Sequence, residues 1–191
     1  MIPLDLWTPV PQPAAFIVPG DASYYPLSEI VRGGAGISDG SQGRDAQNWT
    51  FYYTGTDVKI KDEAGVDRYT LIVAGVTTLS GSFDNNMRPV MTYQTAGGSV
   101  LYFYSTLAED YDTITIADGT SCRVAIDDYR EVYNAASDVL WVYVRGTTVY
   151  WRQQRDRYAT ERTIGTVQSG GVLHRVGQNV QRRFQCEIIY T

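Results

Sequence analysis

Residues that support metal binding or nucleophilic catalysis are scarce in this sequence. Its 191 residues include one histidine, His174, and two cysteines, Cys122 and Cys186. Structural zinc sites need several closely spaced Cys or His ligands, and a Ser-His-Asp or Cys-His centre needs a histidine beside its nucleophile. No phosphate-binding loop, dinucleotide fingerprint or HExxH motif is present either. We therefore expect no cofactor, no metal site and no enzymatic activity, and we interpret His174 as a partly exposed strand residue.

Disulfides and membrane helices are also poorly supported. Cys122 and Cys186 lie far apart and cannot form a disulfide framework, so we expect buried thiols, with a single bridge as the alternative. No stretch approaches the roughly 18 consecutive apolar residues that a membrane helix needs, and the N-terminus lacks the features of a secretory signal. We therefore expect a soluble protein without a membrane partner.

Positive charge is too sparse for a general attraction to nucleic acid. The formal charge is −5, and lysine occurs only twice. Residues 1–141 hold 8 basic and 18 acidic side chains, whereas residues 142–191 hold 8 basic and 3 acidic ones. The acidic part of one copy can therefore face the basic part of the next, although the two parts can also pair within one monomer.

Proline is confined almost entirely to the N-terminus. Six of the seven prolines lie within the first 26 residues, interleaved with large apolar side chains. Such a segment cannot form a helix or a central strand, so we expect an extended arm that packs on its own domain or on a neighbouring subunit. Trp7 and Phe16 are its candidate contact residues. Residues 1–48 are predicted to form this arm and a Gly-rich loop, with one possible helical turn at residues 28–32.

From Trp49 onward, alternating apolar and polar residues indicate β-strands in a recurring pattern. Each copy has an apolar or aromatic strand, a tight turn with glycine and a second alternating strand, as in a β-hairpin. The spacing leaves room for further short strands near residues 69–73 and 113–116. The predicted hairpins cover residues 51–60, 90–103, 142–151 and, more weakly, 173–182, with turn glycines Gly55, Gly98, Gly146 and Gly177.

The hairpins predict an all-β fold of antiparallel meanders in a domain that spans residues 49–191. The meanders are arranged either as propeller-like blades or as a sandwich. A single hairpin is marginally stable, so these units must stack to bury their faces. Three or four units are too few to close a propeller comfortably, which leaves an open sandwich or closure by other copies of the chain. The alternating strand at residues 183–190 is expected to pair with an early strand and protect an edge.

Arginine and aromatic residues gather in the C-terminal third of the chain. Arginine pairs with carboxylates and stacks on rings at protein interfaces, and acidic residues interrupt this run, so we interpret it as a protein interface. Alternatively, the aromatic rings stack on the sugars of a host-surface glycan. The candidate interface residues, including two from the arm, are Trp7, Phe16, Trp141, Trp151, Arg152, Arg155, Arg157 and Tyr158.

Clustered carboxylates offer the one catalytic alternative. Asp110 and Asp112 lie close together in the sequence, and two carboxylates can serve glycoside hydrolysis. Aspartate is favoured in turns because its side chain bonds the local backbone. We therefore interpret these residues as solvated turn residues.

The strongest hairpin carries a resemblance to known proteins. Residues 138–146, 149–152 and 156–158 read DVLWVYVRG, VYWR and DRY. This pattern resembles the repeats of β-rich structural proteins of tailed bacteriophage virions, of the tail, collar and fibre-attachment kind, over residues 49–165. It is also similar to the strands of sialidase-like propellers. The Ser-x-Asp-x-Gly-x-x-Trp box of that family is missing, so the resemblance implies no sialidase activity.

The resemblance and the residue patterns lead to one functional expectation. We expect a virion structural subunit that is made in the host cytoplasm and forms a homo-oligomer. It is expected to contact other virion proteins through β edges, the N-terminal arm and Arg-carboxylate pairs. A receptor- or glycan-binding tip module is the alternative hypothesis.

Overall fold

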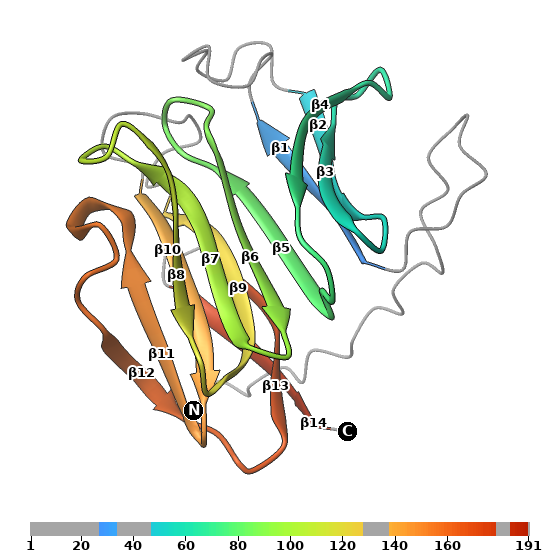
Figure 1. The fold of residues 1–191 in the computed structure, drawn as a ribbon. Coiled ribbons are helices and arrows are strands. Elements are labelled where there is room, and N and C mark those ends of the chain that lie inside the picture. Colours follow the sequence, from blue (N-terminus) through green and yellow to red (C-terminus); the bar gives the residue numbers. More distant parts are fainter. Residues whose placement is uncertain (1–26, 34–46, 128–137, 179–183, 191) are drawn as a thin grey trace, which may run out of the picture.

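The chain folds into antiparallel β-strands joined mainly by short turns (Figure 1). The computed structural model describes residues 27–33, 47–127, 138–178 and 184–190. Within these ranges the only helical element is a 3-10 turn, η1 (Gln154–Asp156), and no α-helix occurs. The predicted all-β antiparallel fold is confirmed. The predicted arm, with Trp7 and Phe16, and most of the Gly-rich loop lie outside the described residues.

The strands form three four-stranded sheets and one two-stranded sheet, each with its strands in sequence order. The first sheet contains β1 (Ser28–Gly33), β2 (Gln47–Tyr53), β3 (Asp57–Lys61) and β4 (Asp67–Ile72). The second sheet contains β5 (Thr78–Phe83), β6 (Pro89–Thr95), β7 (Gly98–Ser105) and β8 (Asp110–Ile116). The third sheet contains β9 (Gly119–Asp127), β10 (Asp138–Arg145), β11 (Thr148–Gln153) and β12 (Arg162–Thr166). The C-terminal hairpin contains β13 (Gly171–Gln178) and β14 (Phe184–Tyr190).

The three four-stranded sheets repeat one arrangement. In each sheet a tight turn joins the second and third strands, and a glycine with positive φ lies in or beside it: Gly55 (107°), Gly98 (117°) and Gly146 (60°). Residues with a side chain rarely adopt these angles, which favours glycine. The strands predicted near residues 69–73 and 113–116 correspond to β4 and β8. The predicted equivalence of the three glycine turns is therefore confirmed.

The predicted helical turn at residues 28–32 is wrong. This segment is β1, which pairs antiparallel with β2 so that Ile30 lies opposite Thr50. Leu27 and Val31 pack against the apolar core beside it. A single helical turn is costly to nucleate, so the hydrogen bonds and burial that sheet pairing provides override the weak local preference.

The C-terminal hairpin also differs from its prediction. Gly177 was expected in the turn but lies within β13, opposite Gln185, so the connection falls in residues 179–183, outside the described part of the chain. The last strand, β14, pairs with β13 and not with an early strand. Pairing with the immediately preceding strand closes a shorter loop and therefore costs less conformational entropy.

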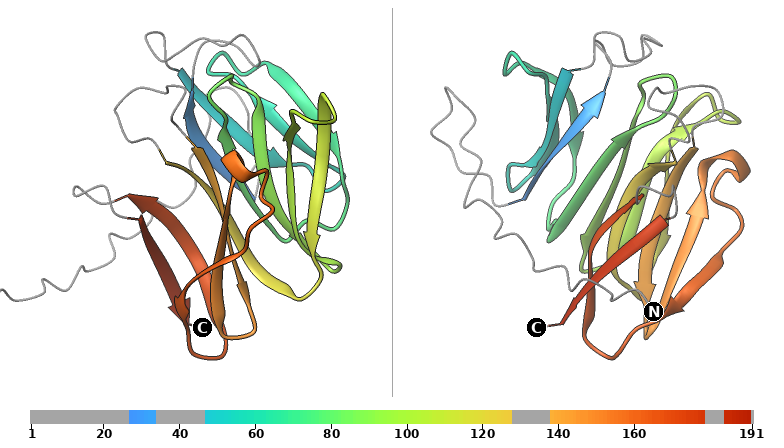
Figure 2. Two further views of the ribbon diagram at one scale, coloured as in Figure 1. Left: turned by 90° about the vertical axis from the view of Figure 1, so that its left-hand side faces the viewer. Right: turned by 180° about the vertical axis from the view of Figure 1, so that it is seen from behind.

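The sheets pack face to face in chain order and enclose three apolar cores (Figures 1 and 2). The first core lies between the first and second sheets, the second core between the second and third sheets, and the third core between the third sheet and the C-terminal hairpin. Their central residues are Trp49, Phe51 and Phe83 in the first core, Phe103, Trp141 and Tyr143 in the second, and Val142, Val144 and Leu173 in the third.

β10 is covered on both faces. All of its residues from Asp138 to Val144 are buried. Trp141 and Tyr143 contribute to the second core, whereas Val142 and Val144 contribute to the third. A strand that is buried on both faces favours a continuous apolar run over alternation, which explains the sequence VLWVYV at residues 139–144.

The first strands of the four units lie together at the centre. β5 contacts β1 and β9, and β9 also contacts β13. All four strands line one pocket of about 380 Å³. Of the two architectures that the sequence left open, this arrangement corresponds to blades around a common centre and not to a two-layer sandwich (Figure 2).

Candidate functional site

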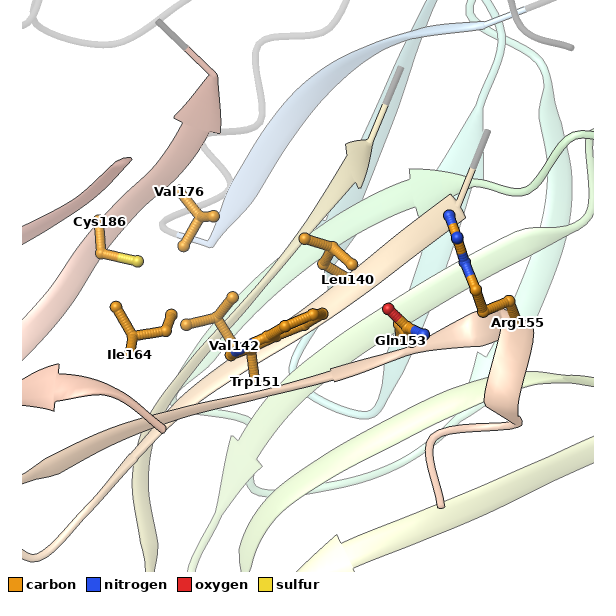
Figure 3. A pocket seen from close by; sticks show the side chains of 8 residues that line it. All are labelled: Leu140, Val142, Trp151, Gln153, Arg155, Ile164, Val176 and Cys186. Atoms are coloured by element: carbon orange, nitrogen blue, oxygen red, sulfur yellow. The ribbon is translucent and has the colours of Figure 1, made fainter. Parts of the chain in front are cut away.

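An apolar cleft opens between the third sheet and the C-terminal hairpin (Figure 3). Its volume is about 330 Å³. Gln153 and Arg155 lie at one end, and the remaining lining is apolar or a thiol (Figure 3). β10, β11 and β12 contribute from one side, and β13 and β14 from the other. The lining residues are Leu140, Val142, Trp151, Gln153, Arg155, Ile164, Val176 and Cys186.

The cleft exists because the third sheet has four strands, whereas the described part of the C-terminal hairpin that packs on it has only two. Cys186 and Ile188 of β14 pack against the third core, beside Val142 of β10. Val149 and Trp151 of β11 also pack on this core, but Trp151 is only partly buried and Ile164 on β12 is 47% exposed. The described residues of the C-terminal hairpin include no third or fourth strand to cover β11 and β12.

The other two interfaces have ring or apolar contacts on their third or fourth strands. Between the first and second sheets, Tyr69 of β4 packs its ring 5.6 Å from Tyr111 of β8, and its hydroxyl shares a hydrogen bond with Tyr102. Between the second and third sheets, Ile114 of β8 and Tyr150 of β11 pack on the second core. A four-stranded neighbour therefore contributes contacts from its fourth strand in both cases, whereas the hairpin beside the cleft has only two described strands.

A charged network fixes the rim of the third sheet on the side of the second core. Glu161 accepts a hydrogen bond of 2.7 Å from Nη2 of Arg145 and one of 3.4 Å from Nη2 of Arg152. The Tyr143 hydroxyl also donates to Glu161. Burial alone raises the pKa of Glu161, but these hydrogen bonds outweigh it and the pKa is lowered. The Arg145 guanidinium also stacks 4.4 Å from the Tyr150 ring.

The turn after β11 is anchored by a buried carboxylate. Asp138 accepts hydrogen bonds from the backbone N–H of Arg155 at 2.9 Å and from its Nε at 2.6 Å. Two consecutive residues, Arg157 and Tyr158, adopt positive φ (57° and 58°). The Tyr158 ring packs edge-on against Phe103 at 5.0 Å. Burial of that ring compensates for the strained backbone of this turn.

The predicted interface residues separate into different environments. Trp141 and Tyr158 are fully buried in the second core, and Trp141 Nε1 donates a 2.9 Å hydrogen bond to Thr92. Neither ring is exposed to a partner or a sugar. Trp151 alone among these aromatic residues lines the cleft.

The predicted arginines are engaged mainly within the chain. Arg152 pairs with Glu161, and Arg155 pairs with Asp138. Arg157 is exposed on the 3-10 turn. The Arg-carboxylate contacts that the sequence suggested between subunits therefore form within one subunit at Arg152 and Arg155.

Sequence reasoning missed most of the cleft. Ile164 and Val176 stand in ordinary alternating strands, and nothing local marks either of them as facing a cleft. The described residues after Thr166 form two strands, whereas each earlier unit has four.

Both cysteines are free thiols, as expected. Cys122 is fully buried in the second core, and burial raises its pKa. Cys186 is partly buried on β14 and borders the cleft, and burial also raises its pKa. The chemical reactivity of the Cys186 thiol should therefore depend on whether the cleft is covered.

The central pocket is polar and combines four charged or titratable residues: Glu29 on β1, Arg123 on β9, and His174 and Arg175 on β13. Gly81 N–H donates a 2.8 Å hydrogen bond to Glu29. Burial raises the pKa of Glu29 despite this hydrogen bond and the nearby arginines. His174 is a partly exposed strand residue, as predicted, but the grouping around it was not foreseen.

The carboxylates considered for hydrolysis lie on a strand and not in a turn. Asp110 and Asp112 are exposed on β8. Each accepts a 2.7 Å hydrogen bond from the N–H of the following residue. The prediction of solvated side chains that bond the local backbone is confirmed, and the predicted turn position is wrong.

Comparisons with protein-family models, curated proteins and solved structures give no match for this chain. In the described ranges, no helix has the length and apolar character needed to cross a membrane. Those ranges also contain no group of three or more His, Cys, Asp or Glu side chains placed to hold a metal ion.

Proposed function

We propose that this chain is a structural subunit of a bacteriophage virion, from the tail or the head-to-tail region. It assembles with further copies of itself and with other virion proteins. The observation that carries this proposal is that the described part of the fourth unit has only two strands, beside which an apolar cleft opens. An uncovered apolar surface beside an unpaired strand edge is typical of a protein that is completed by a partner.

The exposed side chains around the C-terminal hairpin give the proposal an energetic basis. Ile164 is 47% exposed, Ile189 is 38% exposed and Tyr190 is 54% exposed. Complete burial of one such apolar side chain stabilises by about 1.5–3 kcal/mol. A partner that covers several of them gains enough free energy to offset part of the entropy lost on association.

The assignment to a virion rests on the sequence. The repeat resembles those of tail, collar and fibre-attachment proteins. The three equivalent glycine turns support the existence of the repeat in this chain. The acidic N-terminal and basic C-terminal parts favour association of copies. We assign no catalytic role to the chain.

Mass measurement by light scattering at micromolar concentration tests the proposal. We expect one defined oligomer that appears as rings or short sleeves in electron micrographs. Ile164→Glu should dissociate it, because a charge in the cleft cannot be buried without a partner. Ile72→Glu is the matched control, since Ile72 is 85% exposed on the first sheet. A wild-type chain that stays monomeric at these concentrations contradicts the proposal.

Recognition of an acidic glycan is the second candidate, and the central pocket favours it. Arg123 and Arg175 outnumber the single carboxylate of Glu29 there, so the pocket suits a carboxylate-bearing sugar. Trp141 cannot stack on a sugar because it is fully buried. Binding to sialylated or uronic-acid glycans on an array should be lost in Arg175→Ala and kept in Arg157→Ala. Equal binding by both variants excludes this site.

A further inference from the structure

The cleft lies where further strands of the hairpin would stand. In the first interface β4 packs against β8, and in the second β8 and β11 both contribute to the shared core. The described hairpin has no strand beyond β14 to cover Trp151 and Ile164 in a comparable way. We propose that residues 1–26 of a neighbouring copy occupy this cleft, adding an outer strand beside β14. This inference rests on the proposed assembly function and names the segment that performs it.

β14 determines which side of the added strand faces the cleft. Cys186 and Ile188, two residues apart, both pack on the third core. Side chains alternate along a strand, so every second residue of a segment paired with β14 also points toward the third sheet. Those side chains must be apolar, because Trp151 and Ile164 are what they meet.

The N-terminal segment has this alternation. Ile2, Leu4 and Leu6 are separated by single residues. In an extended conformation the three side chains lie on one face, and residues 3 and 5 lie on the other. The segment therefore supplies one continuous apolar face.

The prolines follow the same parity. Five of them occupy odd positions: Pro3, Pro9, Pro11, Pro13 and Pro19. In a strand, the N–H groups of odd and even residues point to opposite edges, so these prolines remove donors from one edge only. The other edge keeps a donor at every even residue from Ile2 to Val18 and can pair with β14. Such a strand accepts no further neighbour on its proline edge, which makes it a terminal strand.

Charge favours the same pairing. Residues 1–26 contain Asp5 and Asp21 and no lysine or arginine. The receiving part, residues 142–191, holds 8 basic and 3 acidic side chains. Arg155, which pairs with Asp138, stands at the end of the cleft with its side chain 59% exposed and adds to the positive charge there.

Disulfide trapping in the full-length chain tests the proposal. Leu6→Cys places a thiol on the even face, toward Cys186, whereas Trp7→Cys places it on the odd face. Under mild oxidation we expect Leu6→Cys to form covalent dimers, and chains through repeated exchange, on a non-reducing gel. Trp7→Cys should form at least about tenfold less covalent dimer. Cys122 stays unreacted because it is fully buried. Peptide mapping must place the bridge at Cys186.

A second measurement uses no new thiol. Cys186 in the wild-type chain should react slowly with an aromatic disulfide reagent, since the segment covers it. Leu4→Asp combined with Leu6→Asp should speed labelling by about tenfold or more, because two buried leucines are lost from the interface. Asp5→Asn is the control on the other face and should leave the rate unchanged.

The outcomes separate this inference from the proposed function. A bridge confined to a single chain shows that the segment returns to its own cleft and overturns the neighbouring copy as occupant. Oligomers without a bridge, and with equal labelling of all variants, overturn the segment as occupant while assembly stands. A monomer that carries an open, reactive Cys186 overturns both proposals.

Discussion

The two faces of the third sheet differ in how far they are covered. Toward the second sheet the apolar contacts run from Trp141 on β10 out to Tyr150 on β11. Toward the C-terminal hairpin they also reach β11, through Val149 and Trp151, but Trp151 is only partly buried beside the cleft and Ile164 on β12 stays 47% exposed. The same sheet therefore has one face that the Arg145–Glu161 network ties together and one face that opens into an apolar cleft. This difference indicates that the apolar side chains of β11 and β12 at the cleft are suited to burial in an assembly of more than one chain.

The largest contrast is expected between two tryptophans. Trp141→Ala should lower the free energy of unfolding by about 3–5 kcal/mol, because it empties a fully buried site and removes the donor to Thr92. Trp151→Ala should cost about 1 kcal/mol in dilute protein, since Trp151 is only partly buried at the edge of the third core and its ring lies beneath the Arg162 guanidinium. Urea unfolding followed by circular dichroism measures both values. Equal costs would remove the distinction between the faces.

Two isoleucines provide a pair with identical chemistry. Ile116 is 8% exposed and packs on the second core, so Ile116→Ala should destabilise by about 2–4 kcal/mol. Ile164→Ala should cost less than about 0.5 kcal/mol in the monomer, as is usual for exposed positions. A cost for Ile164→Ala that rises with protein concentration would show that association buries this side chain.

Replacing a glycine by alanine in each of two interfaces tests how tightly each interface is packed. A Cβ at Gly81 would lie 2.4 Å from the Phe51 ring in the closed interface of the first and second sheets. Gly81→Ala should therefore destabilise by about 1–3 kcal/mol through overpacking. A Cβ at Gly177, on the open side, meets nothing within 4 Å. Gly177→Ala should leave the thermal midpoint unchanged or slightly raised, and a large drop there would reveal a neighbour that fills the space.

The smallest expected effect concerns the charged rim of the closed face. The pKa of Glu161 is lowered in the folded chain, so its ionised form contributes stability above its ordinary value of 4.5. That contribution is lost as the pH falls through the lowered pKa. Glu161→Gln should cost about 1 kcal/mol at neutral pH, and its difference from wild type should vanish in acid.

Glu29 is the control for Glu161, because its pKa shifts in the opposite direction and is raised in the central pocket. Its ionisation weakens the fold as the pH rises, so Glu29→Gln should be at least as stable as wild type at neutral pH. Unfolding curves from pH 3 to 8 compare the two variants. Parallel profiles would contradict the opposite shifts.

The sequence was sufficient for features that depend on neighbouring residues. Gly55, Gly98 and Gly146 mark tight turns because positive φ is a local requirement, and alternation around them indicates strands. The predicted hairpin at residues 142–151 covers the adjoining parts of β10 and β11. These signals located the central hairpin of each sheet.

Features that depend on distant residues were not predictable. Trp141 and Trp151 occupy similar strand patterns, and only the order of the sheets makes one a core residue and the other part of a cleft. Likewise, nothing within residues 28–32 shows that β2 offers them an edge. The central pocket joins residues from β1, β9 and β13, which no local motif connects.

The double cover of β10 implies an uneven resistance to local opening. Each sheet touches mainly its neighbours, so the C-terminal hairpin can detach while the first and second sheets stay folded. Amide protons of β10 should then exchange with deuterium more slowly than those of β14 or β1, which lie in the terminal units. Local unfolding would then begin at the first sheet or at the C-terminal hairpin and proceed toward β10. Binding of another molecule to the hairpin would slow the unfolding that begins there.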